Sequence, residues 1–319
     1  MTTSEIARSS PEWMAQPWNR DGKTSPQRHP EKKENTLKAL RDLTIEDIDA
    51  MDYNNLIALV RETNRIPGGY KTIASIVTNA FLKPEHRILE IGTSTGVTSI
   101  EIAKAVGCSI EAIDINERSL QEAASRARLE GVGDLIDFRL ADAQNLDCEP
   151  ESFDMVTCGN VTSLIPDRKK ALDEYVRVLK PNGVLAAVPM YYLEQPTDEL
   201  LGRVRRAIQT DVQVVERDWW VDFYNQSGLT LKYVENYRFD RIADKTLDEF
   251  IQFILNRDFL QELRPNAYEF LSKKYRDYIY LFRDNLSHMG YSILLYKKEP
   301  VNNEPELFRG TLLSSWDAR

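Results

Sequence analysis

Short apolar runs alternate with amphipathic segments between about residue 84 and residue 188. The apolar runs predict five buried strands, at Arg87 to Ile91, Ser109 to Asp114, Ile136 to Leu140, Phe153 to Gly159 and Gly183 to Val188. Apolar positions at helical spacing predict helices near Thr95 to Val106, Glu117 to Glu130 and Arg168 to Val178. Strands that alternate with helices are typical of a mainly parallel sheet with helices on both faces.

A helical region precedes this alternating part of the chain. Apolar positions at helical spacing predict one helix from Thr44 to Val60, with Thr44 as its N-cap, and a second from Thr72 to Leu82. The turn Pro67-Gly68-Gly69 separates them. We expect these helices to form an N-terminal helical lid on the sheet.

The pattern becomes less regular after residue 190. Helices are expected near Thr197 to Gln209 and Arg217 to Ser227, and two further strands at Thr230 to Tyr237 and Tyr291 to Lys298. The stretch from Leu247 to Leu286, between these strands, is helical in character and too long for a hairpin loop. It therefore predicts a helical cap inserted before the last strand.

These patterns divide the chain into six segments. They are a tail (1–34), the lid (35–83), a core (84–240), the cap (241–289), the last strand of the core (290–299) and a second tail (300–319). The expected fold class is α/β, a Rossmann-like, doubly wound sheet of seven strands with an N-terminal helical lid and a helical cap.

Composition narrows the choice of partners. The 319 residues include 41 Lys and Arg against 50 Asp and Glu, a net charge of −9, which disfavours a nucleic-acid partner. The longest apolar run, Val184 to Leu193, is about half of the ~20 residues that a membrane span requires. The first residues lack a basic segment followed by an apolar one, so a cytoplasmic location is expected. These features of composition are also compatible with a homodimer.

The three cysteines, Cys108, Cys148 and Cys158, are isolated and form no C-x-x-C pair. An odd number of scattered cysteines in such a chain indicates reduced, structural thiols. Neither a disulfide framework nor a metal site is expected.

The most informative segment runs from Ile88 to Thr98 and predicts a buried strand, a turn and the start of a helix. In such a turn, backbone N–H groups and a helix N-terminus face whatever binds there. Gly92 lets the chain turn, and Gly96 lets a ligand or a strand approach the helix, so that a valine at Gly96 is expected to block binding in a folded protein. The turn lacks G-x-G-x-x-G, which disfavours a nicotinamide-dependent oxidoreductase.

The pattern Glu90-x-Gly92-x-Ser94-x-Gly96 resembles the first motif of the class I S-adenosylmethionine-dependent methyltransferases, in which an acidic residue precedes three glycines. Ser94 stands at the middle glycine. Further matches follow in the family's order over about a hundred residues, at Asp114-Ile115, Asp142-Ala143, Asn160 and Lys180-Pro181-Asn182-Gly183. The resemblance covers roughly residues 84 to 190.

The resemblance implies S-adenosylmethionine as cofactor and S-adenosylhomocysteine as product. A carboxylate at Asp114, 24 residues after Glu90, can accept both ribose hydroxyls. By the resemblance, Ile115 packs on the adenine and Asp142 lies near its amino group. The residues expected to bind the cofactor are Glu90, Gly92, Thr93, Ser94, Gly96, Asp114, Ile115, Asp142, Ala143, Asn160 and, on the lid, Tyr70.

Methyl transfer from a sulfonium is an in-line displacement, so the protein chiefly aligns the reactants and excludes water. Glu194, after the fifth strand, is a candidate base or cation partner, with a solvated loop carboxylate as the alternative. His288, before the last strand, is the other candidate base, although its place favours a structural role.

We therefore expect a methyltransferase that acts on a small-molecule acceptor in specialised metabolism, because the cap should enclose a pocket. Two alternatives stay open. One is methylation of a protein or peptide, if cap and lid leave an open groove. The other is a subunit that binds the cofactor without catalysis.

Overall fold

A computed structural model of the chain describes residues 38–300. The tails predicted at residues 1–34 and 300–319 lie outside this range except for Pro300, as do residues 35–37 of the predicted lid. No helix between residues 38 and 300 is long and apolar enough to cross a membrane.

The described residues contain one sheet of eight strands in the order β3-β2-β1-β4-β5-β8-β6, with β7 also paired to β8. Strands β1 to β5 are parallel, and β8 is antiparallel to its neighbours. The strands are β1 (Arg87–Ile91), β2 (Ser109–Asp114), β3 (Ile136–Leu140), β4 (Phe153–Cys158), β5 (Leu179–Ala187), β6 (Met190–Tyr192), β7 (Thr230–Arg238) and β8 (Met289–Lys297). The α/β class and its mainly parallel sheet are confirmed. The strand count is one higher than expected because three residues, Met190–Tyr192, pair with the start of β8.

Ten α-helices accompany the sheet within the described range. They are α1 (Ile45–Asp49), α2 (Tyr53–Leu59), α3 (Tyr70–Asn79), α4 (Val97–Val106), α5 (Glu117–Leu129), α6 (Arg168–Val178), α7 (Asp198–Ile208), α8 (Arg217–Asn225), α9 (Asp244–Leu255) and α10 (Pro265–Leu286). Four short 3-10 turns are η2 (Leu40–Asp42), η3 (Gly133–Leu135), η4 (Asn160–Leu164) and η5 (Asp258–Glu262).

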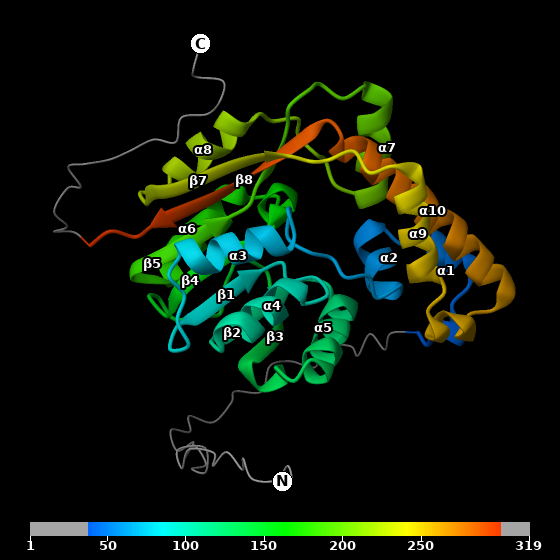
Figure 1. Cartoon of the computed structure of the whole chain (residues 1–319), viewed down its shortest axis with the longest axis horizontal. Coiled ribbons are helices and arrows are strands. Elements are labelled where there is room, and N and C mark those ends of the chain that lie inside the picture. Colours follow the sequence, from blue (N-terminus) through cyan, green and yellow to red (C-terminus); the bar gives the residue numbers. More distant parts are fainter. Residues whose placement is uncertain (1–37, 301–319) are drawn as a thin grey trace, which may run out of the picture. The chain divides into compact units, whose positions relative to one another are not determined.

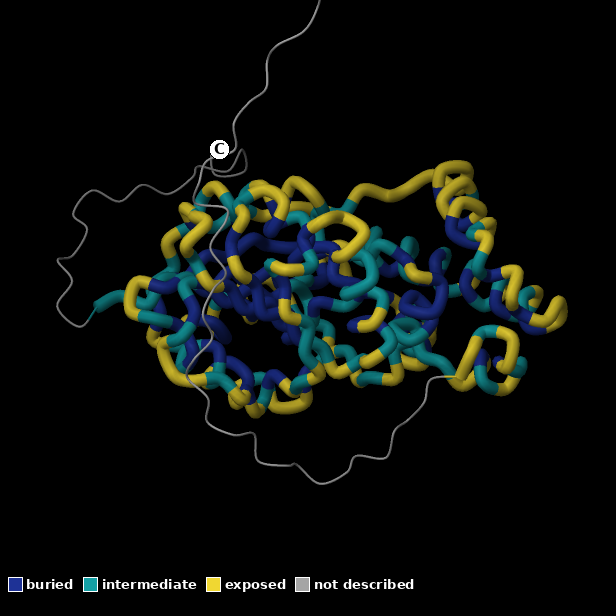
Figure 2. Tube along the Cα trace, turned by 90° about the horizontal axis from the view of Figure 1, so that it is seen from below, coloured by how far each residue is buried: buried dark blue, intermediate teal, exposed yellow. Residues whose placement is uncertain are grey.

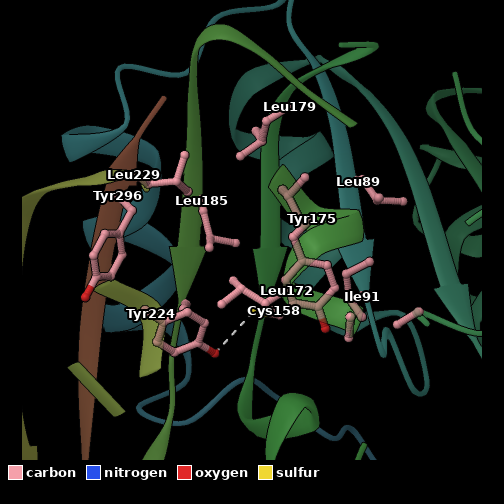
Figure 3. Close-up of a cluster of buried hydrophobic side chains, with 14 of the residues drawn as sticks. Leu89, Ile91, Cys158, Leu172, Tyr175, Leu179, Leu185, Tyr224, Leu229 and Tyr296 are labelled. Atoms are coloured by element: carbon pink, nitrogen blue, oxygen red, sulfur yellow. Dashed lines mark hydrogen bonds between the residues drawn. The ribbon is translucent and has the colours of Figure 1, made fainter. Parts of the chain in front are cut away.

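Helices cover both faces of the sheet, as the alternating pattern predicted (Figure 1). Adjacent strand residues alternate between the faces, so that Ile88 packs with α3, α4 and α5 whereas Leu89 packs with α6 and α8. Figure 3 shows the second of these clusters, in which Tyr175 of α6 and Tyr224 of α8 meet the strand residues Leu89 and Cys158. Figure 2 shows the buried stretches of the chain in the interior and the exposed stretches on the outside.

The helix predicted from Thr44 to Val60 is two helices, α1 and α2. Thr44 is the expected N-cap: its hydroxyl accepts from the Asp47 N–H, and the Asp47 carboxylate accepts from the Thr44 N–H. The helix is interrupted before Asp52, whose side chain caps α2 by accepting a hydrogen bond from the Asn55 N–H. A second N-cap residue within the apolar pattern therefore divides the helix.

Helices from the predicted lid and the predicted cap share one hydrophobic core. We call α1, α2, α9, η5 and α10 the helical unit; its buried side chains include Leu43, Ile48, Leu56, Leu59, Ile251, Ile254, Leu260, Leu271 and Tyr275. The Lys274 ammonium on α10 donates to the carbonyl oxygens of Ile48, Asp49 and Met51 at the end of α1. Segments more than two hundred residues apart in the sequence thus fold together. The boundaries given above for lid and cap stay a prediction.

Candidate functional site

The turn between β1 and α4 is held against the end of β2. The N–H groups of Gly92 and Thr93 both donate to the Ile113 carbonyl, at 2.8 and 2.9 Å. Gly92 has φ +70°, and a Cβ on it would lie 2.5 Å from the Val161 side chain. Glycine is required here both by backbone conformation and by the close approach of η4.

Gly96 has a different role from the one expected. Its φ is +79°, and a Cβ on it would lie 2.6 Å from the Ala123 Cβ and 3.2 Å from the Phe138 ring. The close approach that Gly96 permits is therefore between the start of α4 and helix α5. The expectation that a valine here leaves the protein folded is wrong, because the added carbons meet the core and not a ligand.

Ser94, at the middle glycine of the motif, also has a left-handed backbone, with φ +51°. Its N–H donates to Asp114 Oδ2 at 2.8 Å, and its hydroxyl accepts from Asn64 Nδ2 at 3.3 Å. Hydrogen bonds on both sides of the residue hold it in a conformation that costs a non-glycine residue about 1–2 kcal/mol.

Ser94→Gly is expected to be more stable than Ser94→Ala by about 1 kcal/mol. Both variants lose the hydroxyl, but only glycine removes the cost of the left-handed backbone conformation. Urea denaturation of the two variants measures the difference. Equal free energies of unfolding would contradict a left-handed Ser94.

Glu90 is buried beside the turn and hydrogen-bonded to it. Its buried carboxylate accepts from the hydroxyls of Thr93, at 2.7 Å, and Ser99. Burial raises the pKa of Glu90, while these hydrogen bonds lower it. Glu90 and the buried Thr93 therefore brace the turn, and their predicted contact with the cofactor stays a prediction.

Asp114 lies at the tip of β2 with both oxygens turned to backbone donors. Oδ1 accepts from the Asn116 N–H and Oδ2 from the Ser94 N–H, each at 2.8 Å. Burial raises the pKa of Asp114, and these backbone hydrogen bonds lower it. A carboxylate has about four acceptor positions, so capacity is left for two hydroxyl groups. The next side chain, Ile115, is 79% exposed and free to cover a flat ring.

The third predicted segment follows β3. The Ala141 N–H donates to the Asp114 carbonyl at 3.1 Å, which ties the tips of β2 and β3 together. Asp142 is exposed, and its carboxylate accepts from the Gln144 backbone and side-chain amides. Ala143 is buried in the hydrophobic core.

The segment that lies against the turn is the loop between α2 and α3. Thr95 Oγ1 donates to the Glu62 carbonyl at 2.8 Å, and the Asn64 N–H donates to Thr95 Oγ1 at 3.3 Å. Further along, Ile66 lies close to Gly159 at the end of β4. Tyr70 is not brought to the motif: it is 70% exposed, and within the described residues it makes no side-chain hydrogen bond.

The same loop connects the turn to the helical unit. The Tyr275 hydroxyl of α10 donates to Glu62 Oε2 at 2.6 Å, and Arg257 donates to the carbonyls of Val60 and Arg61. Burial raises the pKa of Glu62, whereas the bond from Tyr275 and the charge of Arg257 lower it. A buried carboxylate thus couples α10 to the loop over the motif.

Tyr275→Phe is expected to destabilise the protein by about 1–3 kcal/mol at pH 7, because the buried Glu62 carboxyl group loses its hydrogen-bond donor. Removing that donor raises the pKa of Glu62 further above its ordinary value. The folded variant then binds a proton at Glu62 more tightly than the unfolded chain does. The loss of stability is therefore largest above the folded-state pKa of Glu62, and it shrinks as the pH falls towards the unfolded-state value of about 4.3.

Chemical denaturation at pH 7 and near pH 4.5 measures this change. Tyr268→Phe is the matched control, because the Tyr268 hydroxyl donates to the neutral Leu255 carbonyl at 3.1 Å and its loss should not depend on pH. A Tyr275→Phe effect that is the same at both pH values would contradict an ionised Glu62 partner.

A cavity of about 30 Å³ lies at the tips of β4 and β6. It is lined by Asn160, Ser163, Arg168, Met190, Tyr192, Val212, Gln213, Val215, Trp220 and Met289. Asn160 Oδ1 accepts from the Met190 N–H at 2.9 Å, and Trp220 Nε1 donates to the Met190 carbonyl at 2.9 Å. The predicted cofactor residue Asn160 therefore also forms one wall of this cavity.

A larger cavity of about 260 Å³ lies between the helical unit and α5, lined by residues such as Leu59, Arg118, Ser125 and Phe259. Of the predicted cap, only Phe259 lines this cavity, so the expectation that the cap encloses a pocket stays a prediction. The cavity at the strand tips is bounded instead by η4, β6, α8 and the connection before α8.

Glu194 and His288 are brought together. Their side chains approach to 3.7 Å, between His288 Nδ1 and Glu194 Oε2, and the His288 carbonyl accepts from the N–H groups of Leu193 and Glu194. Glu194 also lies 3.4 Å from Arg238. Neither Glu194 nor His288 lines the cavity at the strand tips, so a role as base stays a prediction.

The cysteines are free thiols. Burial raises the pKa of Cys108, Cys148 and Cys158 to about 11, which keeps them protonated and unreactive at neutral pH. Between residues 38 and 300, no three His, Cys, Asp or Glu side chains are grouped as ligands for a metal ion.

Three residues at the site were not predicted from the sequence: Glu62, Asn64 and Arg168. The first two belong to a polar loop before Pro67, where no motif marks a contact with the glycine turn. Arg168 opens a helix with an ordinary amphipathic pattern, and only the fold brings it to the strand tips.

Comparisons with known proteins agree with this geometry. Residues 88–183 match the model of a methyltransferase domain. An uncharacterized protein from Haemophilus influenzae is 32% identical over 177 residues, which are 55% of this chain and 70% of that protein. The 27-O-demethylrifamycin SV methyltransferase of Amycolatopsis mediterranei is 30% identical over 157 residues, 49% of this chain and 58% of the relative.

The fold is also that of a solved enzyme. Haemonchus contortus phosphoethanolamine N-methyltransferase 2, determined with phosphomonomethylethanolamine and S-adenosylhomocysteine, superposes with a TM-score of 0.60 at 19% identity. The superposition covers 81% of this chain and 61% of that one. The match to the Amycolatopsis enzyme likewise spans less than two thirds of that protein.

Proposed function

This chain belongs to the class I S-adenosylmethionine-dependent methyltransferases, and we propose that it methylates a small-molecule acceptor in specialised metabolism. The observation that carries the proposal is the cavity at the tips of β4 and β6. Its cover is formed by Val212, Gln213 and Val215, before α8, and by Trp220 of α8. The Tyr192 N–H donates to the Val215 carbonyl at 3.0 Å and fixes this cover to β6. A covered recess of about 30 Å³ has room for one functional group of an acceptor molecule and none for a polypeptide segment.

The relative from Amycolatopsis supports the choice of acceptor, since its name gives a demethylrifamycin as substrate. The net charge of −9 favours a small molecule over a nucleic acid.

The residues at the glycine turn fit S-adenosylmethionine. Asp114 has acceptor capacity for two ribose hydroxyls, Ile115 presents an exposed apolar face, and Gly92 keeps the turn free of side chain. When bound, the cofactor supplies a methyl group on a positively charged sulfur.

The chain's own contribution to transfer is alignment. Glu90 and Thr93 fix the turn, and the loop at Asn64 lies over it, so that the cofactor site is formed before binding. Asn160 joins the tip of β4 to β6 and therefore sets the distance between the cofactor side and the acceptor side. Trp220 and the segment before α8 exclude water from the acceptor side.

Methyl-labelled S-adenosylmethionine tests the proposal. The protein is incubated with the small-molecule fraction and, separately, with the protein fraction of cells that express it. We expect label to appear in the small-molecule fraction. Label confined to the protein fraction would favour a protein methyltransferase. S-Adenosylhomocysteine binding with no transfer to either fraction would favour a non-catalytic subunit.

A further inference from the structure

The cavity at the strand tips contains a positive charge with no neutralising partner. Arg168, at the start of α6, lines this cavity. Its Nη1 donates to Gln213 Oε1 at 2.9 Å and its Nη2 to the Ser163 carbonyl at 2.8 Å, both uncharged acceptors. Within residues 38–300, no carboxylate forms an ion pair with it.

The guanidinium is incompletely hydrogen-bonded. Nε is shielded from solvent and has no hydrogen-bond partner in the structure. A guanidinium carries five N–H donors, and two are engaged, which leaves Nε and one N–H on each terminal nitrogen. Leaving buried donors of a charged group unpaired is costly, and proteins rarely keep such a group without a function.

The groups around the Arg168 guanidinium shield it from water and do not neutralise its charge. The rings of Trp219 and Trp220 lie 5.7 and 6.0 Å from the guanidinium carbon and shield it from water. Burial lowers the pKa of Arg168, and the through-space effect of Asp211 raises it. Asp211 is itself exposed and paired with Arg205 at 3.0 Å.

Several other polar groups of the cavity are engaged within the protein. The indole of Trp220 donates to the Met190 carbonyl, Asn160 accepts from the Met190 N–H, and the Tyr192 hydroxyl donates to Asn285 Oδ1 at 3.0 Å. Arg168 is the one charged side chain in the cavity lining, and within that lining it alone has a shielded donor that no acceptor meets. Its terminal nitrogens each keep one further N–H, which can donate a charge-assisted hydrogen bond to a carboxylate.

We infer that the acceptor of this methyltransferase carries a carboxylate, which Arg168 binds beside Trp220 at the tips of β4 and β6. The inference rests on the proposed function and specifies the chemical class of its substrate. About 30 Å³ is room for one or two water molecules, which suits a flat carboxylate better than a phosphate. The carboxylate anchors the acceptor, and the nucleophile is another atom of the same molecule.

Saturation-transfer NMR titrations on protein loaded with S-adenosylhomocysteine test the inference, with benzoate and benzamide as an isosteric pair. Benzoate is expected to bind about tenfold or more tightly than benzamide. Arg168→Gln should remove this preference, and Arg168→Lys should keep only part of it because the planar fork is lost. Lys169→Gln is the matched control: it removes a charge from the adjacent position, where Lys169 pairs with Asp173 on the surface.

Equal binding of benzoate and benzamide, no binding of either, or a benzoate affinity unchanged in Arg168→Gln would overturn the inference. Phenyl phosphate binding more tightly than benzoate would assign the site to a phosphate instead. Affinity for S-adenosylhomocysteine, measured on every variant, should not change. A wild-type protein that does not bind S-adenosylhomocysteine would count against the proposed function. In that case, the comparison of benzoate with benzamide on the unloaded protein would still test the role of Arg168.

Discussion

Asp114→Ala is expected to weaken S-adenosylhomocysteine binding by about a hundredfold or more. The carboxylate is positioned by the N–H groups of Ser94 and Asn116 and has capacity for both ribose hydroxyls. Two hydrogen bonds to a charged acceptor contribute about 1.5–3 kcal/mol each, and the alanine removes both. Titration calorimetry of the two proteins with S-adenosylhomocysteine measures the change.

Two controls separate this effect from damage to the turn. Asp114→Asn keeps one oxygen acceptor in place and should lose less affinity than alanine. Asp134→Ala, at an exposed position in η3, should bind as the wild-type protein does. Unchanged affinity in Asp114→Ala, with a normal circular dichroism spectrum, would show that Asp114 does not hold the ribose.

Gly96→Val is expected to lower the free energy of unfolding by about 3 kcal/mol or more, or to prevent folding. The backbone is left-handed, which costs about 1–2 kcal/mol for a residue with a Cβ, and more for a branched one. The added carbons overlap Ala123 of α5, and overpacking of this kind costs a further 1–3 kcal/mol or so. Urea denaturation followed by circular dichroism gives the value.

The chain offers a matched pair for the steric part of this effect. Gly131 has a similar φ of +74°, but a Cβ on it would have nothing within 4 Å, whereas on Gly96 it would lie 2.6 Å from Ala123. Gly131→Ala should therefore show only the backbone cost, and Gly96→Ala should be less stable than Gly131→Ala by about 1–3 kcal/mol. If the two alanine variants are equally stable, α4 and α5 are not in the close contact described here.

The sheet could be predicted from the sequence because its central strands, such as β1, β2 and β4, are buried on both faces. Runs such as Arg87–Ile91 and Ser109–Asp114 stand out against amphipathic neighbours, and their order along the chain follows the alternation of strand and helix. The strand Met190–Tyr192 is too short to give a period of its own. The break at Asp52 was missed because the apolar spacing of α1 continues into α2, and only a capping side chain separates them.

The turn could also be predicted, since strand, glycines and helix start lie within a dozen residues. Contacts between distant segments could not. The pairing of Tyr275 with Glu62, the approach of His288 to Glu194 and the place of Arg168 all depend on the tertiary fold. A single sequence carries no signal for such pairs, because hydrophobic periodicity reports which face of an element is buried and not what it meets.

Parallel calorimetric titrations of the purified chain with S-adenosylmethionine, S-adenosylhomocysteine and NADH test the central claim most directly. A cofactor site built on the turn from Gly92 to Gly96 and on Asp114 predicts saturable binding of both sulfur nucleotides and no response to NADH. Binding of NADH alone, or no binding of either sulfur nucleotide, would contradict the account of this site.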